Sequence, residues 1–146
     1  YLEDYYDVTP SEFYEAERGA GVYSGHATTW TGKIGLMYPS DYGYATSGGT
    51  TEDRAACLAK GLNNWRDLSD CSGNDYLLDA SRRSPSTLTP HSANAYNVFC
   101  VSSDGGVHRI GVSDAYGVRP ALFLKSNILV DKGTGAKSDP YHLKMQ

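Results

Sequence analysis

The sequence predicts an α+β fold in which short antiparallel strands outnumber the helices. Capping residues and apolar spacing indicate one or two helices, and an Asp-Gly hairpin signal between two strand-like runs indicates antiparallel pairing. The length of 146 residues suits a single domain, 1–146, in which 1–25 is interpreted as a linker or N-terminal helix leading from an anchor region. We therefore expect short twisted strands and long loops around one core.

Two segments carry helix signals. Thr9 is a plausible N-cap before Pro10, and the helix is expected over Ser11–Arg18, since proline suits the first helical position and glutamates suit the first turn. The second helix is expected over 52–64 with Thr51 as its N-cap. One apolar stripe predicts its buried side, formed by Ala55, Leu58, Leu62 and Trp65.

Short apolar runs bounded by turn residues predict the strands. The clearest pair flanks the hairpin loop 102–106, which contains Asp104-Gly105. A turn at Pro39–Asp41 ends the first strand, and irregular structure is expected over Tyr42–Tyr44. The expected strands are Lys33–Tyr38, Tyr76–Leu78, Ala95–Val101, Val107–Val112, Tyr116–Leu124 and Asn127–Val130.

The composition excludes some partners and favours others. With 13 basic and 17 acidic residues the formal net charge is −4, which argues against nucleic acid, and every apolar run is too short to cross a bilayer. The 12 tyrosines beside 3 phenylalanines favour a recognition face, because tyrosine combines a rigid contact area with a polar tip. The alternative is that tyrosines fill half-buried strand positions.

Three cysteines, Cys57, Cys71 and Cys100, allow one disulfide and leave one thiol. Three pairings are possible, and spacing alone does not choose among them. We favour Cys57 with Cys71, a link expected to stabilise an exported protein by roughly 3 kcal/mol.

Known catalytic patterns are absent from the sequence. There is no Gly-x-Ser-x-Gly elbow, and Cys100 lies in an apolar strand without a neighbouring cation. The four histidines, His26, His91, His108 and His142, lack the spacing of metal ligands. We therefore expect no enzyme, no metal and no cofactor.

Arg119 lies between Val118 and Pro120 in an otherwise apolar strand, where an unpaired charge is costly. Asp41 is its candidate partner, and the alternative is that Arg119 points into a ligand site. Trp30 and Trp65 are the other residues expected to be structural.

A second polar set lies around the predicted hairpin. Short polar, aromatic and basic side chains of this kind form contact surfaces more often than cores, although an ordinary solvated loop is the alternative. The candidate binding residues are Arg82, Arg83, Ser86, Thr89, His91, Asn94, Tyr96, His108, Arg109, Asp114 and Tyr116.

An ordered string of motifs resembles a family of surface proteins. The motifs are 30–45, Cys57-Leu58 and Cys71, 74–77, Ser84-Pro85, 103–105, and 116–128, which contains the Gly-Val-Arg-Pro run 117–120. The string, spread over most of 18–141, is similar to the DUF6273-type C-terminal module of Firmicutes surface and pilin-like proteins. The resemblance implies a C-type-lectin-like fold, by way of similar endings in formylglycine-generating-enzyme-like domains.

The resemblance also bears on single residues. Cys57 and Cys71 match a recurring cysteine pair, which supports that disulfide, whereas Cys100 replaces an aliphatic or aromatic residue. Arg82-Arg83 departs from the family pattern of an aromatic followed by small residues.

Some C-type-lectin-like proteins are variable proteins of diversity-generating retroelements, and the segment 75–116 resembles such a variable face. The calcium motif of sugar-binding lectins is absent from the sequence.

Three functions are weighed. The first is a non-catalytic, extracellular, cell-surface adhesion module that binds a protein or glycan on a host, phage or neighbouring cell. The second is a pilin-like filament subunit that self-associates through tyrosines, namely Tyr5, Tyr6, Tyr14 and Tyr23. The third is an enzyme on a formylglycine-generating scaffold, which would need a paired thiol or a copper site.

Overall fold

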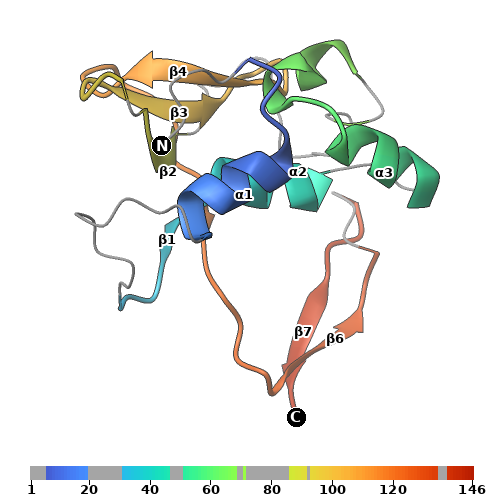
Figure 1. Cartoon of the computed structure of the whole chain (residues 1–146). Helices are drawn as coiled ribbons and strands as arrows, with labels where there is room; N and C mark the ends of the chain where they lie inside the picture. The colour runs from blue at the N-terminus through green and yellow to red at the C-terminus, as the bar shows by residue number, and fades with distance from the viewer. Residues whose placement is uncertain are drawn as a thin grey trace.

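The described helices lie in the first half of the chain (Figure 1). The computed structural model describes residues 6–19, 31–46, 51–68, 71, 86–91, 93–134 and 138–146. Its helices are α1 (Pro10–Arg18), α2 (Pro39–Thr46), α3 (Thr51–Leu58) and the 3₁₀ helix η1 (Leu62–Asp67). The described part of the chain thus has more helices than the one or two that the sequence predicts.

The described strands form three antiparallel sheets. The strands are β1 (Gly35–Leu36), β2 (Ser86–Pro90), β3 (Asn97–Val101), β4 (Val107–Gly111), β5 (Pro120–Ala121), β6 (Ile128–Lys132) and β7 (His142–Met145). β1 pairs with β5, β2–β3–β4 form the central sheet, and β6 pairs with β7. The predicted α+β class with antiparallel sheet is confirmed.

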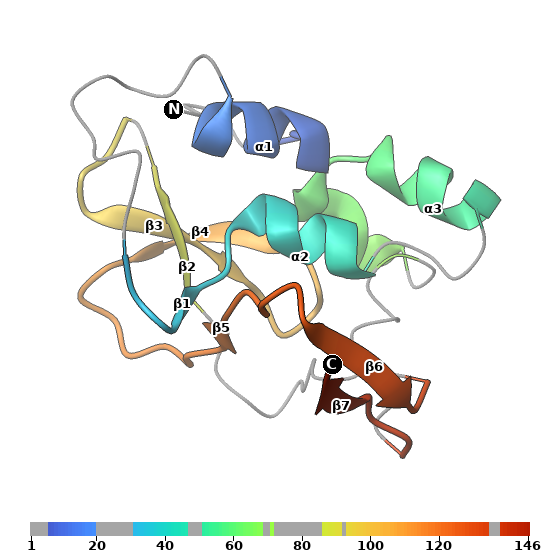
Figure 2. The ribbon, with the colours of Figure 1, turned by 90° about the horizontal axis from the view of Figure 1, so that it is seen from below.

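The main body is a central sheet packed against helices. In Figure 1 the β2–β3–β4 sheet lies above α1 and α2, which run beside each other. The β6–β7 hairpin extends on the other side of these helices, away from the central sheet (Figures 1 and 2). One packed body and one projecting hairpin therefore make up the described architecture.

α1 begins as predicted, with a complete capping box. The Glu12 backbone N–H donates to Thr9 Oγ1 at 3.3 Å, and the Thr9 backbone N–H donates to Glu12 Oε2 at 2.8 Å. Hydrogen bonds from the backbone and side chain of Thr9 hold the pKa of Glu12 below its usual value. The cap orients α1 so that Pro10 and Phe13 are buried.

α2 corrects the prediction of a turn at Pro39–Asp41 followed by irregular structure. A proline followed by Ser and Asp starts a helix as readily as a turn, and here the helix is selected by packing. Gly43 allows that packing, because a Cβ there would lie 2.7 Å from Pro10 Cγ and 3.0 Å from Leu62 Cδ2. The glycine therefore marks a close approach of α1, α2 and η1.

The expected helix over 52–64 is two elements. α3 ends at Leu58, and η1 begins after Gly61, whose backbone approaches that of Asp7. Thr51 is the first helical residue instead of the cap. The predicted apolar stripe is broken accordingly, since Ala55 is exposed while the η1 residues Leu62 and Trp65 are fully buried.

The central hairpin is confirmed. β3 and β4 pair from Asn97–Gly111 to Val101–Val107, and the Ser102 N–H donates to the Gly106 carbonyl across the turn at 2.7 Å. Gly105 adopts a φ of 90°, a left-handed conformation that favours glycine. The Asp-Gly signal in the sequence therefore located this turn correctly.

The other predicted strands are shortened or displaced. The runs 33–38 and 116–124 pair only as Gly35–Ala121 and Leu36–Pro120, because Pro120 lacks an N–H and Pro39 already begins α2. The strand expected at 127–130 is confirmed as β6, whereas its partner β7 was not predicted. The run 76–78 lies outside the described residues.

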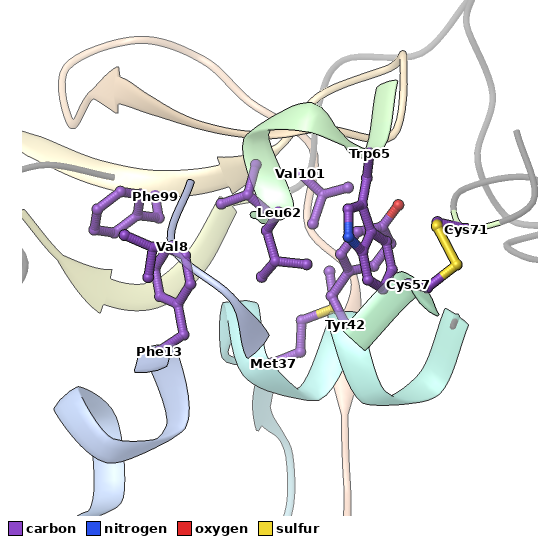
Figure 3. Packing of buried hydrophobic residues seen from close by; sticks show 11 residues of the cluster. Val8, Phe13, Met37, Tyr42, Cys57, Leu62, Trp65, Cys71, Phe99 and Val101 are labelled. Carbon is purple, nitrogen blue, oxygen red and sulfur yellow. A yellow bond between two sulfur atoms is a disulfide. The ribbon is translucent and has the colours of Figure 1, made fainter. Parts of the chain in front are cut away.

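The core joins aromatic side chains from the helices to the central sheet (Figure 3). The Phe13 and Phe99 rings meet edge to face at 5.2 Å between centroids, and Tyr42 lies 6.0 Å from Trp65. The buried Tyr42 hydroxyl donates to the Gly105 carbonyl at 2.9 Å. This bond ties α2 to the β3–β4 turn and satisfies a polar atom that would otherwise be buried unpaired.

A disulfide bond lies at the edge of this core. Cys57 and Cys71 are bonded, with Cα atoms 5.5 Å apart, and both are buried. The favoured pairing is confirmed, and Cys100 is a buried free thiol. None of the described helices has the length and apolar character needed to span a membrane.

Candidate functional site

The structure divides the predicted binding residues. Arg82 and Arg83 lie outside the described residues, as does the side chain of Ser86, whose backbone pairs with Cys100 at the start of β2. The remaining eight residues lie in the core, at the β3–β4 turn, or around the opposite end of that hairpin. They do not form one continuous surface.

Thr89 and His91 do not lie on the exposed binding face that was predicted for them, because both are buried. The Thr89 hydroxyl donates to Glu17 Oε1 at 3.0 Å. His91 is 3% exposed, its ring lies 5.8 Å from that of Phe99, and neither ring nitrogen has a hydrogen-bond partner. Residues at this depth cannot contact a ligand on an exposed face, and the strand pattern of β2 turns them toward the core.

His108 lies at the β3–β4 turn. Its Nε2 is 3.9 Å from Asp104 Oδ1, a charge contact only when the imidazole is protonated. Burial lowers the pKa of His108 and Arg66 lowers it further, while Asp104 raises it. His108 therefore belongs to the contact between the central sheet and η1.

Five predicted residues remain on the surface, Arg109 in the middle of β4 and the others toward the far end of the hairpin, and we call them the Tyr96 surface. They come from the loop before β3, from β4 and from the segment after β4, and are Asn94, Tyr96, Arg109, Asp114 and Tyr116. The Tyr96 side chain is 78% exposed. Arg109 and Asp114 are also exposed, and Tyr116 is half-buried.

Backbone hydrogen bonds hold the loop that carries Tyr96. The Tyr96 N–H donates to Asn94 Oδ1 at 2.9 Å, and the Val112 N–H donates to the Tyr96 carbonyl at 2.8 Å. The Asp114 N–H donates to the Gly111 carbonyl at 3.2 Å, which forms the turn on the β4 side. The loop before β3 and the turn after β4 are thus joined, which brings Asn94, Tyr96 and Asp114 to one end of the hairpin.

A polar cluster around the half-buried Glu17, with buried partners, was not predicted. Glu17 on α1 accepts from the Ser40 hydroxyl of α2 through Oε2 and from the Thr89 hydroxyl of β2 through Oε1. Burial raises the pKa of Glu17 to about 7, against the lowering effect of the Ser40 and Thr89 hydrogen bonds and of Arg18. This cluster connects two helices and the sheet at one point in the interior.

The sequence did hold a sign of this cluster. Glu17 follows Phe13 by four residues, so both lie on one side of α1, and Phe13 is the apolar residue that marks that side as buried. A glutamate at this spacing requires polar partners in the interior.

Asp41 also corrects a prediction, because it binds Arg18 instead of serving as the expected partner of Arg119. Both Asp41 carboxylate oxygens lie 2.7 Å from Arg18 Nη2, and Oδ2 also accepts from the Tyr38 N–H at 3.0 Å. The Arg18 guanidinium lies 4.3 Å from the centre of the Tyr38 ring. Arg119 is half-buried near β5.

Trp65 and Cys100 are two further residues that the structure buries. Trp65 is fully buried in η1, while Trp30 lies outside the described residues. Burial raises the pKa of the Cys100 thiol to about 11, so it is held in the unreactive protonated form. Among residues that the structure describes, no three potential metal ligands lie close enough together to hold an ion.

The comparison with known families gives one match. The family model described as a domain of unknown function (DUF6273) matches residues 16–126. The chain belongs to this family. No curated protein and no solved structure matches it.

The DUF6273 match includes the Glu17 cluster, the disulfide and the Tyr96 surface. Its last residue, 126, lies directly before β6. The β6–β7 hairpin is therefore an element beyond the family match, and its surroundings differ from those of the rest of the molecule.

Proposed function

We propose that this DUF6273 domain is a non-catalytic, extracellular recognition module with a C-type-lectin-like fold, and that it binds a protein ligand through the Tyr96 surface. The observation that carries the proposal is the Tyr96 side chain, 78% exposed on a loop held by backbone hydrogen bonds. A large aromatic side chain left open to solvent on a fixed loop is typical of recognition surfaces.

The loop geometry supports binding by reducing its entropic cost. Because the Asn94 side chain and the Val112 N–H already hold the Tyr96 backbone, little ordering of the loop is needed when a ligand binds. Asp114 at the same end of the hairpin and Arg109 in the middle of β4 supply charges of both signs for the rim of such a contact. An exposed aromatic side chain with charged residues around it is better suited to contact with another protein than to binding a small molecule in a deep pocket.

The extracellular setting is supported by the disulfide. Structural disulfides persist where the environment is oxidising, and Cys57–Cys71 closes the edge of the core next to η1. The non-catalytic character is supported by Ser40 and Thr89, which are buried and occupy both carboxylate oxygens of Glu17 with hydrogen bonds.

The proposal is tested by binding measurements on the whole chain. The immobilised protein is exposed to a panel of purified extracellular-matrix proteins and mucin glycoproteins, and the variant Tyr96→Ser is compared with Tyr141→Ser. Tyr141 is an exposed tyrosine of the C-terminal segment and serves as the matched control.

We expect Tyr96→Ser to weaken a detected interaction by about tenfold or more and Tyr141→Ser to leave it unchanged. Equal affinity of the Tyr96→Ser variant and the parent would overturn the assignment of this surface. Binding that survives complete deproteinisation of the mucins would replace the protein ligand with a glycan.

A further inference from the structure

The β6–β7 hairpin has one wholly apolar face, whereas its other face carries Leu129 together with charged residues. The register pairs Ile128 with Met145 and Val130 with Leu143, and side chains of paired residues at alternate positions share a face. We call these four residues the hairpin face. On the other face Lys144 Nζ lies 2.7 Å from Asp131 Oδ1, so these charges neutralise each other.

The hairpin face is open to solvent. Val130 is 56% exposed and Met145 is 77% exposed, and just before the hairpin Phe123 is 94% exposed. No described residue from 122 to 146 is buried. Contiguous apolar surface of this kind marks an interaction site, and a two-stranded hairpin without a cover is only marginally stable in water.

The charge distribution points to the occupant of this face. Residues 119–146 contain five basic and two acidic residues, whereas residues 1–118 contain eight basic and 15 acidic residues. The hairpin therefore lies on a basic segment, and the rest of the same chain is acidic. A second hairpin would repel it, and the acidic body of another copy would attract it.

A surface that complements the hairpin lies on α1. Tyr14 and Glu15 are exposed at adjacent positions of α1, Glu12 is exposed one turn before Glu15, and Tyr6 is exposed in the segment before the helix. We call these four residues the α1 face. It offers acidic groups to the lysines and aromatic area to the apolar side chains, in the composition expected of a protein contact.

The two faces lie at different ends of the molecule. In Figure 2 α1 is at the top and the β6–β7 hairpin is at the lower right, with α2 between them. One copy can therefore use both faces at once, with different neighbours. A contact between unlike faces repeats from copy to copy and builds a chain or a ring.

We propose that the hairpin face of one copy docks on the α1 face of a second copy, so that the protein assembles head to tail. The apolar side chains of β6 and β7 are covered in that contact, and Lys132 and Lys125 at its margin meet the glutamates of α1. This assembly uses surfaces separate from the Tyr96 surface and is independent of the function proposed above.

The first experiment is sedimentation of the whole chain over a wide concentration range at low and at high salt. We expect species larger than a monomer that dissociate as salt rises, since exposed charges are screened. Val130→Thr, alone and combined with Leu143→Thr, is expected to weaken association about tenfold or more. Val112→Thr is the matched control, because Val112, just after β4, is also an exposed valine, at 54%, and lies outside both faces.

A complementation experiment tests the head-to-tail geometry. The hairpin variant Val130→Thr/Leu143→Thr and the α1 variant Tyr14→Ser/Glu15→Lys are each expected to be monomeric. Their equimolar mixture is expected to form dimers that do not grow, because each variant retains the face that the other has lost. Circular dichroism of each variant checks that the body is folded.

Three results would overturn the proposal. A monomeric parent at all concentrations would show that the hairpin face is not covered by a second copy. Dimerisation of the α1 variant by itself would indicate a symmetric hairpin–hairpin contact. Association that is equally weakened by Val112→Thr would place the contact elsewhere on the surface.

Discussion

The packed body and the β6–β7 hairpin contain similar residue types in opposite surroundings. In the body, apolar side chains of α1, α2 and η1 meet those of β3 and β4, and Phe13, Trp65 and Phe99 are completely buried. In the hairpin, Val130, Leu143 and Met145 are spaced as regularly along their strands and stay exposed. A regular pattern thus establishes which side chains share a face, and only a second layer of structure determines whether that face becomes a core.

The largest expected effect is on the core side of this comparison. Trp65→Ala removes a fully buried indole packed on Tyr42, and we expect the free energy of unfolding to fall by about 3–5 kcal/mol. Val130→Ala in the exposed hairpin is expected to lower it by less than ~1 kcal/mol. Urea unfolding followed by circular dichroism measures both, and similar losses would show that the hairpin is part of the cooperative body.

A pH-dependent effect is expected from the Glu17 cluster inside the body. Because the pKa of Glu17 rises from 4.5 to about 7 on folding, the folded state binds its proton more tightly than the unfolded chain. The stability gained from that proton is fully present below pH ~4.5 and is lost as pH rises through about 7, a change of about 3 kcal/mol.

The measurement is the free energy of unfolding from pH ~4.5 to ~8 for the parent and for Glu17→Gln. We expect the neutral glutamine to flatten this decline. Glu15→Gln changes an exposed glutamate of the same helix and should leave the decline in place. A decline of the same size in Glu17→Gln and in the parent would show that Glu17 is not its source.

The smallest effect is expected from removing the hairpin itself. A chain that ends at Ser126 retains the entire family match and loses no described buried residue. We expect its free energy of unfolding to stay within about 0.5 kcal/mol of the parent value when both are monomeric. A larger loss, measured by urea unfolding at low protein concentration, would mean that β6–β7 supports the body.

The difference between the two regions also explains which sequence predictions succeeded. Signals that act within a few residues were reliable: the capping box at Thr9, the Asp-Gly turn at Gly105 and the strand at β6 are all present. The cap and the turn depend on hydrogen bonds and backbone angles inside their own segments, so the rest of the molecule hardly alters them.

Predictions that depend on distant contacts were less successful. The segment after Pro39 forms α2 because Gly43 lets α1 and η1 approach it, and the helix after Thr51 stops early because Gly61 lies against Asp7. These contacts join residues far apart in the chain, and local propensity contains no information about them. The sequence therefore could not distinguish helix from turn at Pro39.

The candidate site shows the same difference between local signals and distant contacts. Polar residues around the hairpin were expected to form one face, yet Thr89 and His91 point into the core while Asn94 and Tyr96 remain outside. A serine, threonine or histidine is compatible with either environment when it is hydrogen-bonded or packed against an aromatic ring. The bulge in β2 and the packing of α1 determine which environment each one has.

The sequence by itself determined the α+β class, the family, the first helix and the central hairpin, and it favoured the disulfide pairing that the structure contains. Only the tertiary structure decided that Glu17 is half-buried and bonded to Ser40 and Thr89, that Asp41 binds Arg18, and that the β6–β7 hairpin is left uncovered. The physical reason is range: caps and turns are settled by neighbouring residues, whereas burial depends on the elements that the folded chain brings against each face.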